Sequence, residues 1–330
     1  MRNLTLLSLC LALFLLPVSY GRERLVVFGD SLSDIGNSFL ASGGTAPPGD
    51  PLAPLGSPLR GDYGETFDGT GAIFLGRFTD GQNWVDYFPG VAEQFHVDIS
   101  PVTAWLQDPN NDSATDFAVG GSTSGGLNVI NPALPSFPEQ ITAYLNGPGL
   151  KNAADDLCVI WIGANDFGAK MKPLRTVANI KDAIAQLSAA GAKNFFVITI
   201  PDLALTPQVK AAGGATILAA TQFVVTTNVL LAVELPRFAF EHQISIDLVD
   251  INAIFIPLVF SPGRFGFTNS SGEAYNLNLP LSSSNPVPDP NDYVFWDGFH
   301  PTTNVYKLAA AFIFQNIFLS RQIRPFLSLR

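Results

Sequence analysis

Short apolar runs alternate with helical stretches along most of this 330-residue chain, and the alternation restricts the folds open to it. The runs are rich in β-branched and aromatic residues, which is typical of strands buried on both faces. Strands that alternate with helices form a mostly parallel sheet with helices on both of its faces. The sequence therefore predicts an α/β fold. The expected strands are 25–28, 116–119, 157–162, 195–200 and 244–249, and the expected helices are 81–88, 136–145, 177–190, 211–240 and 302–318.

The chain is acidic, which restricts its partners. It has 28 Asp and Glu against 18 Lys and Arg, for a net charge of −10, and it contains no basic run. This balance argues against nucleic acid or an anionic lipid surface as the main partner. Hydrophobic residues make up 47% of the sequence, so a chain of this length buries a core without needing a metal or a disulfide.

The first 21 residues have the form of a secretory signal peptide. Arg2 supplies an early positive charge, an apolar run spans residues 4–16, and the small residues Ser19 and Gly21 precede the expected cleavage point after Gly21. The alternative is an uncleaved anchor, but the run is shorter than the ~20 residues that a bilayer span requires. We therefore expect a secreted protein with no membrane span once the signal peptide is removed.

The remainder, from residue 22 to residue 330, is expected to form one domain, because no linker-like shift in composition and no internal repeat interrupts it. Cys158 is its only cysteine, so we expect a buried free thiol and no intramolecular disulfide. No cluster of cysteines and histidines has metal-ligand spacing, and we expect neither a metal nor a cofactor. Asn111 and Asn269 begin glycosylation sequons, whose use depends on the host.

Ser31 is the candidate nucleophile. It follows the apolar run 25–28 at a Gly29–Asp30–Ser31 turn, where a strand cannot easily continue. In open α/β sheets, ligands bind in the crevice beyond the carboxyl ends of the strands, so a serine at this place is well positioned for chemistry. Taken alone, the motif is equally compatible with an ordinary strand–turn–helix segment.

A candidate base and its orienting acid lie together near the end of the chain. Of the three histidines, His96 and His242 are expected to be structural, whereas His300 follows Asp297 by three residues and precedes a proline before the last helix. In acyl transfer, a histidine takes the proton of the nucleophile, and a carboxylate on its other ring nitrogen holds the tautomer. Asp297 and His300 are therefore the candidate acid and base for Ser31.

Acyl transfer also needs hydrogen-bond donors for an oxyanion. Asn165 follows the expected strand 157–162 and offers a side-chain amide. The backbone N–H groups of Ser31 and Gly121 complete the candidate set, with Gly120 as an open alternative to its neighbour. Each feature is weak alone, but their joint occurrence at strand ends predicts a site for acyl transfer.

These residues lie in sequence blocks that resemble those of the GDSL, or SGNH, hydrolases. The similarity is greatest to the secreted lipase/esterase branch, which includes plant GDSL lipases and thermolabile haemolysin-like enzymes. The resemblance spans the chain from Leu25 to the last helix, and it implies a flavodoxin-like three-layer α/β/α sandwich. It also implies a Ser–His–Asp triad and a three-donor oxyanion hole on the candidate residues named above. The blocks are Gly29–Leu32, Gly121, Gly163–Asp166 and Asp297–His300.

The other acidic residues near these blocks are expected to be structural. Asp30, Asp34 and Asp166 are placed to orient turns or cap helices. Thr79 and Asp80 are expected to cap the helix 81–88.

The leading hypothesis is a secreted serine esterase or lipase that cleaves carboxylic esters through an acyl-enzyme. One alternative is an acyltransferase that uses the same site with an alcohol as acceptor. Another is a catalytically silent lipid- or glycan-binding protein of the same fold. The Phe-rich loops are compatible with lipid esters, and an acidic secreted enzyme is compatible with acylated glycans, so the ester substrate is left as a small molecule, a lipid or an acylated glycan.

Overall fold

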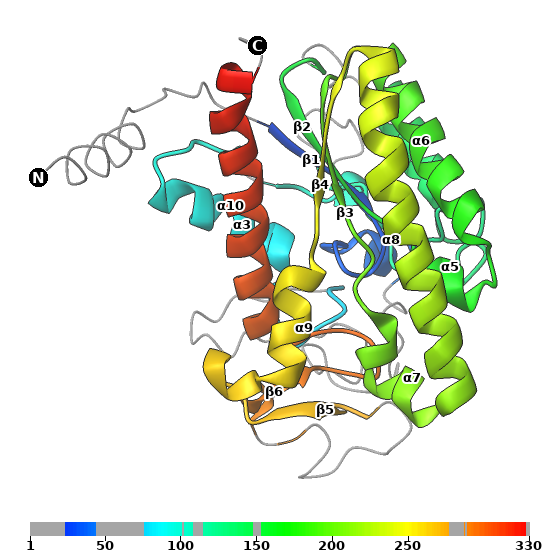
Figure 1. The fold of residues 1–330 in the computed structure, drawn as a ribbon, viewed down its shortest axis with the longest axis vertical. Coiled ribbons are helices and arrows are strands. Elements are labelled where there is room, and N and C mark those ends of the chain that lie inside the picture. The colour runs from blue at the N-terminus through cyan, green and yellow to red at the C-terminus, as the bar shows by residue number, and fades with distance from the viewer. Residues whose placement is uncertain are drawn as a thin grey trace, which may run out of the picture.

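The computed structural model describes residues 24–43, 76–100, 102–107, 115–147, 153–276, 287 and 289–327. The expected signal peptide, residues 1–21, and the sequon at Asn111 lie outside these residues. Within the described part of the chain, a central sheet lies between two layers of helices (Figure 1). The predicted α/β class is therefore confirmed.

Four parallel strands form the central sheet, in the order β1-β2-β3-β4. In the register of the sheet, Val27 of β1 pairs with Val159, which in turn pairs with Phe196. Parallel sheets are covered on both faces, and this is why the strands read as nearly continuous apolar runs in the sequence. The strands are β1 (Arg24–Gly29), β2 (Asp156–Trp161), β3 (Asn194–Ile198) and β4 (Ser245–Val249).

A further extended segment lies along the free edge of β1. Phe117 donates its backbone N–H to the carbonyl oxygen of Val27 over 2.8 Å, and Val27 donates its N–H to Thr115 over 2.7 Å. Asp116 forms isolated parallel bridges to Val27 and to Ala104, so the expected strand 116–119 is an extended segment rather than a regular strand. Its position completes the 2-1-3-4-5 spatial order of flavodoxin-like sheets.

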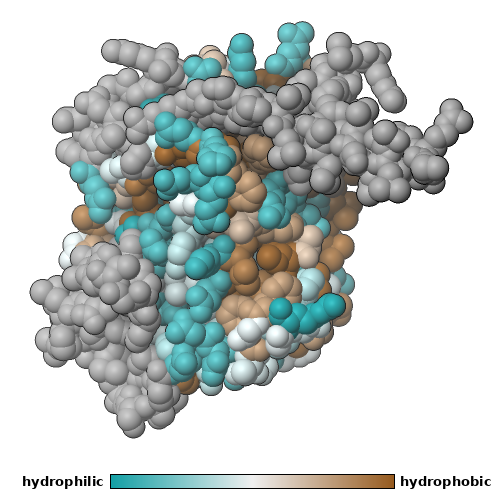
Figure 2. Space-filling view, turned by 90° about the vertical axis from the view of Figure 1, so that its left-hand side faces the viewer, coloured by the Kyte–Doolittle hydropathy of each residue, from teal (hydrophilic) through white to brown (hydrophobic). Residues whose placement is uncertain are grey.

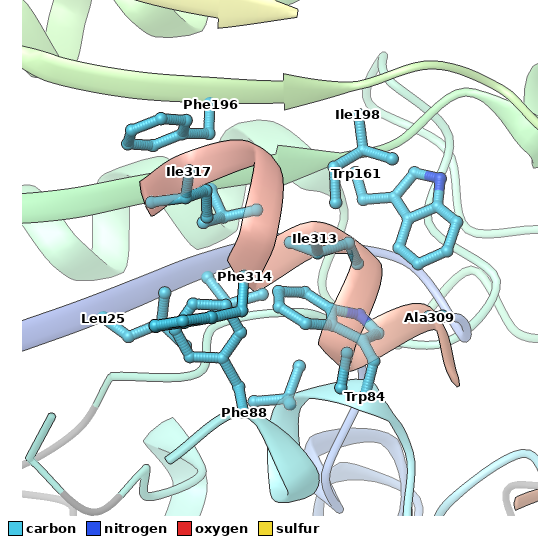
Figure 3. Close-up of a cluster of buried hydrophobic side chains, with 14 of the residues drawn as sticks. Leu25, Trp84, Phe88, Trp161, Phe196, Ile198, Ala309, Ile313, Phe314 and Ile317 are labelled. Carbon is cyan, nitrogen blue, oxygen red and sulfur yellow. The ribbon is translucent and has the colours of Figure 1, made fainter. Parts of the chain in front are cut away.

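Alternate residues of β1 face two separate cores, one on each side of the sheet. Leu25 and Val27 pack with α3 and α10, where Trp84 lies between the helices (Figure 3). Val26 and Phe28 pack with α4, α6 and α8 on the opposite face. The helices of these two layers are α3 (Trp84–Gln94), α4 (Phe137–Asn146), α6 (Pro173–Ala189), α8 (Gly214–His242) and α10 (Thr303–Leu327).

The start of α3 differs from the prediction. The helix begins at Trp84, three residues later than expected, and Asn83 and Asp86 form a capping box at its N-terminus. The expectation that Asp80 and the threonine before it cap this helix is therefore wrong. The Asp80 carboxylate instead accepts the backbone N–H of Thr303 over 2.7 Å and so ties this segment to the start of α10.

Several elements were not anticipated. The helix α9 (Asn252–Phe260) is apolar all round and contains Pro257, so its sequence shows no helical period. The segment between α9 and the last helix contains a two-stranded sheet of β5 (Asn269–Glu273) and β6 (Tyr293–Phe295), and neither strand was expected. Short helices also follow the strands: α2 (Asn37–Ala41), α5 (Ala164–Gly168) and α7 (Pro207–Ala211).

The helix α8 is long and apolar enough to cross a membrane by length and composition. It packs against α6 and β4 as one of the helices that cover the sheet (Figure 1). Core helices of soluble proteins, which are mostly buried, meet the same criteria, but only 28% of the most apolar stretch of α8 is buried.

Candidate active site

Ser31, His300 and Asp297 form a hydrogen-bonded chain beyond the carboxyl end of β1. The Nε2 atom of His300 lies 2.8 Å from the Oγ atom of Ser31. The other ring nitrogen, Nδ1, lies 2.7 Å from Oδ2 of Asp297 and 3.0 Å from Oδ1. These are the distances at which a histidine takes the proton of a nucleophile while a carboxylate orients it. The fold thus brings together the three residues predicted from the sequence.

Asp297 is held in place by the loop that carries His300. Its carboxylate is buried and accepts the backbone N–H groups of Phe299 and His300 over 2.8 and 2.7 Å. Burial alone raises the pKa of Asp297, but the adjacent His300 and the hydrogen bonds outweigh it and hold this pKa below its ordinary value. The side chain is therefore ionised at neutral pH, which favours a proton on Nδ1 and leaves Nε2 free to accept the Ser31 proton.

Gly120 and Gly121 differ in whether the protein itself uses their backbone N–H groups. The N–H of Gly120 is used inside the protein, because it donates to the carboxylate of Asp34 over 2.8 Å. The N–H groups of Ser31 and Gly121 have no acceptor within the described part of the chain. Gly121 has φ 78°, and an added Cβ there would lie 2.5 Å from Oδ1 of Asn128. The geometry favours Gly121 over Gly120 as a donor.

Asn165 lies in the short helix α5, which begins shortly after the end of β2. Its Nδ2 donates one hydrogen bond to the carbonyl oxygen of Ser122 over 3.0 Å, which fixes the orientation of the amide. A primary amide carries two N–H donors, so one remains for a ligand. Ser31, Gly121 and Asn165 all line one cavity. The three predicted oxyanion donors therefore converge on the same space.

Asp34 organises the backbone around the candidate nucleophile Ser31 and the glycine pair Gly120–Gly121. Its carboxylate accepts the N–H groups of Gly36, Asn37 and Ser38 over 2.6 to 3.0 Å, the hydroxyl of Ser38, and the N–H of Gly120. This single side chain joins the helix that follows Ser31 to the glycine turn. Its expected structural role is confirmed.

Asp166 likewise holds the backbone of the block Gly163–Asp166 in place through hydrogen bonds. It accepts the N–H and the hydroxyl of Ser124 over 2.7 and 2.6 Å and the hydroxyl of Thr176 over 2.6 Å. Asp166 therefore links the turn after β2 to the loop that follows Gly121, as the sequence predicted.

Two further residues shape the site beside the candidate triad and oxyanion donors. Gln140 of α4 donates to the carbonyl oxygen of Gly29 over 2.8 Å and accepts its N–H over 3.0 Å, which fixes the strand end just before Ser31. A glutamine on the buried face of an otherwise apolar helix stripe is the signal that would have identified it. The ring of Phe78 lies against His300, with ring centroids 5.3 Å apart.

The cavity that opens at Ser31 has a volume of about 630 Å³. It extends from the triad toward α7, α9 and the start of α8, and its wall is mostly apolar. His96 and His242 do not line it. The large apolar residues in its wall are Leu32, Phe78, Val129, Ile130, Trp161, Phe167, Leu203, Val209, Ile251, Ile254, Phe255, Leu258, Phe299, Val305 and Tyr306.

Asp30 is a buried carboxyl group beside the candidate nucleophile. Its Oδ1 accepts the N–H of Leu32 over 3.1 Å, and its Oδ2 is buried with no hydrogen-bond partner in the described part of the chain. Because burial disfavours the charged form, the pKa of Asp30 is raised to about 7. Asp30 is thus close to half-protonated at neutral pH.

We expect Asp30→Asn to remove a pH-dependent cost of folding. The folded state binds the Asp30 proton more tightly than the unfolded chain, whose pKa is 3.8, so this residue destabilises the protein increasingly as pH rises from about 4 to about 7. A shift of this size corresponds to ~4 kcal/mol as an upper limit. Thermal melts should show the Tm of the variant rising relative to wild type across this range. A difference in Tm that is independent of pH would contradict the prediction.

Comparisons with known proteins agree with the sequence blocks. A family model described as GDSL-like Lipase/Acylhydrolase matches residues 25–313. The chain is 28% identical to the thermolabile hemolysin of Vibrio parahaemolyticus, over 87% of this chain and 62% of that protein, which is less than two thirds of its length. It is 25% identical to a GDSL esterase/lipase of Arabidopsis thaliana, over 89% of this chain and 85% of that protein. It is 24% identical to the phosphatidylcholine-sterol acyltransferase of Aeromonas hydrophila, over 88% of this chain and 90% of that protein.

Among solved structures, a lipase/acylhydrolase from Enterococcus faecalis aligns over 89% of this chain and 95% of its own, with a TM-score of 0.42 and 12% identity. The family match runs from β1 into α10 and so includes every block that carries the hydrogen-bonded chain and the oxyanion donors. The resemblance inferred from the blocks is confirmed. The chain belongs to the GDSL-like lipase/acylhydrolase family, whose members named here include an esterase/lipase and an acyltransferase.

Proposed function

We propose that this protein is a secreted serine esterase or lipase in which Ser31 is the nucleophile, His300 the general base and Asp297 its orienting acid. The observation that carries the proposal is the unbroken hydrogen-bonded chain from Asp297 through His300 to Ser31, which opens into an apolar cavity. The N–H groups of Ser31 and Gly121 and the amide of Asn165 serve as the oxyanion hole.

In the acylation half of the reaction, Nε2 of His300 accepts the proton of Ser31 as Oγ attacks the ester carbonyl carbon. The carbonyl oxygen becomes an oxyanion, which the three donors stabilise in the water-poor cavity. When the intermediate collapses, the bond to the alcohol oxygen breaks and the imidazolium returns its proton to the leaving alkoxide. The acyl group is then bound to Ser31 as an ester.

In deacylation, water attacks the acyl-enzyme by the same route, with His300 again as base, and the carboxylic acid is released. An alcohol in place of this water would make the enzyme an acyltransferase. One relative is named as a phosphatidylcholine-sterol acyltransferase, and this supports keeping acyl transfer as the second candidate. The intact triad and oxyanion residues argue against a catalytically silent binding protein.

The substrate that fits this cavity best is an ester with an acyl chain longer than acetyl. Large aliphatic and aromatic side chains make up most of the wall beyond the triad, and they favour a hydrocarbon chain over a hydrated sugar. The names of two relatives, a hemolysin and a phosphatidylcholine-sterol acyltransferase, support a lipid ester.

Secretion is proposed from the form of residues 1–21, whose apolar run ends in small residues. A relative of Salmonella typhimurium that is 29% identical over 56% of this chain is named a secreted effector protein, which supports this localisation. N-terminal sequencing of protein recovered from the culture medium of its host would find Arg22 first if cleavage follows Gly21.

The experiment that tests the proposed function is hydrolysis of p-nitrophenyl esters with acyl chains from acetyl to palmitoyl. We expect turnover, with kcat/KM higher for octanoate and longer chains than for acetate, because each methylene that enters the apolar cavity adds burial. A preference for acetate would indicate an acetylesterase. A folded protein with no turnover at any chain length would overturn the esterase proposal and favour an acyltransferase with a narrow acceptor or a binding protein.

A further inference from the structure

The loop directly after Gly121 exposes large apolar side chains. Within residues 122–133, here called the apolar loop, Leu127, Val129 and Ile130 are 58%, 49% and 38% exposed. The surrounding stretch 117–138 contains no charged residue. A charge-free loop with exposed aliphatic side chains marks an interaction surface.

The apolar loop is held firmly in this arrangement. Ser122 and Asn128 form an antiparallel bridge, and Val129 donates its N–H to the carbonyl oxygen of Gly121 over 2.8 Å. The buried amide of Asn128 donates to Gly120 over 2.8 Å and accepts the N–H of Ile130 over 3.0 Å. The side chains at the tip therefore point outward because the backbone fixes them there, and a partner meets them without reordering the loop.

Two of these side chains, Val129 and Ile130, form part of the cavity mouth. Val129 and Ile130 are both exposed and line the cavity, and so does Phe299, which is 49% exposed and lies on the loop of the candidate acid and base. The mouth is therefore bordered by apolar residues from two separate segments. A surface that covers this border would face the opening that leads to Ser31.

We propose that the apolar loop docks the enzyme on an uncharged or zwitterionic lipid surface, with the cavity mouth facing the lipid. The proposal rests on the proposed function, because it supplies lipid esters directly to the site. The charge of the protein, as well as the position of the apolar loop, indicates which kind of lipid surface it binds. The loop offers no cation to an anionic headgroup, and the chain as a whole carries a net charge of −10, which disfavours an anionic membrane.

Exposure alone does not select this loop, because other apolar residues also lie at the surface. Figure 2 shows hydrophobic areas beside a hydrophilic band on the face of the molecule that lies at the left of Figure 1. The outer side of α8 carries Leu218, Val225, Val229 and Val233, which are 55% to 65% exposed. None of these four lines the cavity, whereas the apolar loop is continuous with its mouth.

The test compares two leucines of equal exposure. Leu127 in the apolar loop is 58% exposed and Leu218 on α8 is 59% exposed, and neither lines the cavity. The full chain is sedimented with vesicles of ether-linked phosphatidylcholine, which the enzyme cannot hydrolyse. We expect Leu127→Ser to bind the vesicles about tenfold more weakly than wild type, because burying one leucine side chain in lipid raises the affinity by about tenfold. We expect Leu218→Ser to bind within about twofold of wild type.

Activity on soluble p-nitrophenyl acetate should be unchanged in both variants, and this readout separates docking from catalysis. Adding anionic lipid to the vesicles should lower the binding of wild type.

Wild type that remains in the supernatant while it hydrolyses soluble esters would overturn the docking proposal and leave the proposed function standing. An equal loss in both variants, or a loss in Leu218→Ser alone, would also overturn it. A wild-type dimer that Leu127→Ser converts to a monomer would show that a second copy covers the loop. Leu127→Lys, tested in parallel, repeats the measurement should the serine variant fail to fold.

Discussion

Ser31→Ala is expected to lower kcat for ester hydrolysis by about 10⁴ to 10⁶-fold and to leave the protein folded. The hydroxyl of Ser31 is the group that His300 Nε2 contacts at 2.8 Å, and its removal leaves no oxygen to form the acyl-enzyme. The measurement is turnover of the preferred p-nitrophenyl ester, with circular dichroism to verify folding. A fluorophosphonate probe should label wild type and fail to label the variant, as seen by intact mass.

Ser33→Ala is the matched control for this variant. Ser33 is a buried serine two residues further along, and its Oγ accepts the indole N–H of Trp84 over 3.0 Å. Its loss should cost about 1–3 kcal/mol of stability, because a buried donor is left without an acceptor, while turnover stays within a few-fold of wild type. Wild-type turnover in Ser31→Ala, or labelling of the probe at another residue, would refute Ser31 as the nucleophile.

Asn165→Ala should reduce kcat by about 10²–10³-fold, the usual cost of removing one oxyanion donor. The effect should fall on kcat rather than on KM, because the oxyanion forms only after attack. Stability should change little, since the side chain is partly exposed and its one hydrogen bond, to the carbonyl oxygen of Ser122, is one that water can replace. Steady-state kinetics on one p-nitrophenyl ester measures both parameters.

The control for this variant is Asn179→Ala. Asn179 carries another amide in the same region, and its Nδ2 donates to the hydroxyl of Ser124 over 3.0 Å, but it does not line the cavity. Its removal should leave kcat within a few-fold of wild type. Equal activity of Asn165→Ala and wild type, or equal losses in the two variants, would exclude Asn165 as an oxyanion donor.

The strands of the sheet were predictable from the sequence, whereas several helix ends were not. An apolar run such as 157–162 identifies a strand because both faces of β2 are buried, and no tertiary detail is needed to see this. The start of α3 depends on the capping box of Asn83 and Asp86, because Asp80 is drawn to Thr303 at the other end of the chain. The helix α9 was not predicted, because it is apolar on every side and its sequence has no helical pattern of polar and apolar residues.

Some residues of the candidate site were likewise predictable from local sequence, and others were not. Asp297 and His300 lie three residues apart on one loop, so local spacing predicts that they meet. Ser31 reaches them across 269 residues, and its place was inferred from the strand end and from the resemblance to a family. The choice between Gly120 and Gly121 could not be made from the sequence, because it depends on the hydrogen bond of Gly120 to Asp34, a long-range contact.

By itself, the sequence determined the fold class, the identity of the candidate nucleophile, base and acid, and the family, because these follow from local apolar patterns and from short blocks. Tertiary structure alone decided which backbone N–H faces the cavity, how large and apolar that cavity is, and that Val129 and Ile130 lie exposed at its mouth. The physical reason is that burial and hydrogen-bond partners are properties of segments far apart in the chain. They come into existence only when parallel strands bring their carboxyl ends to one edge of the sheet.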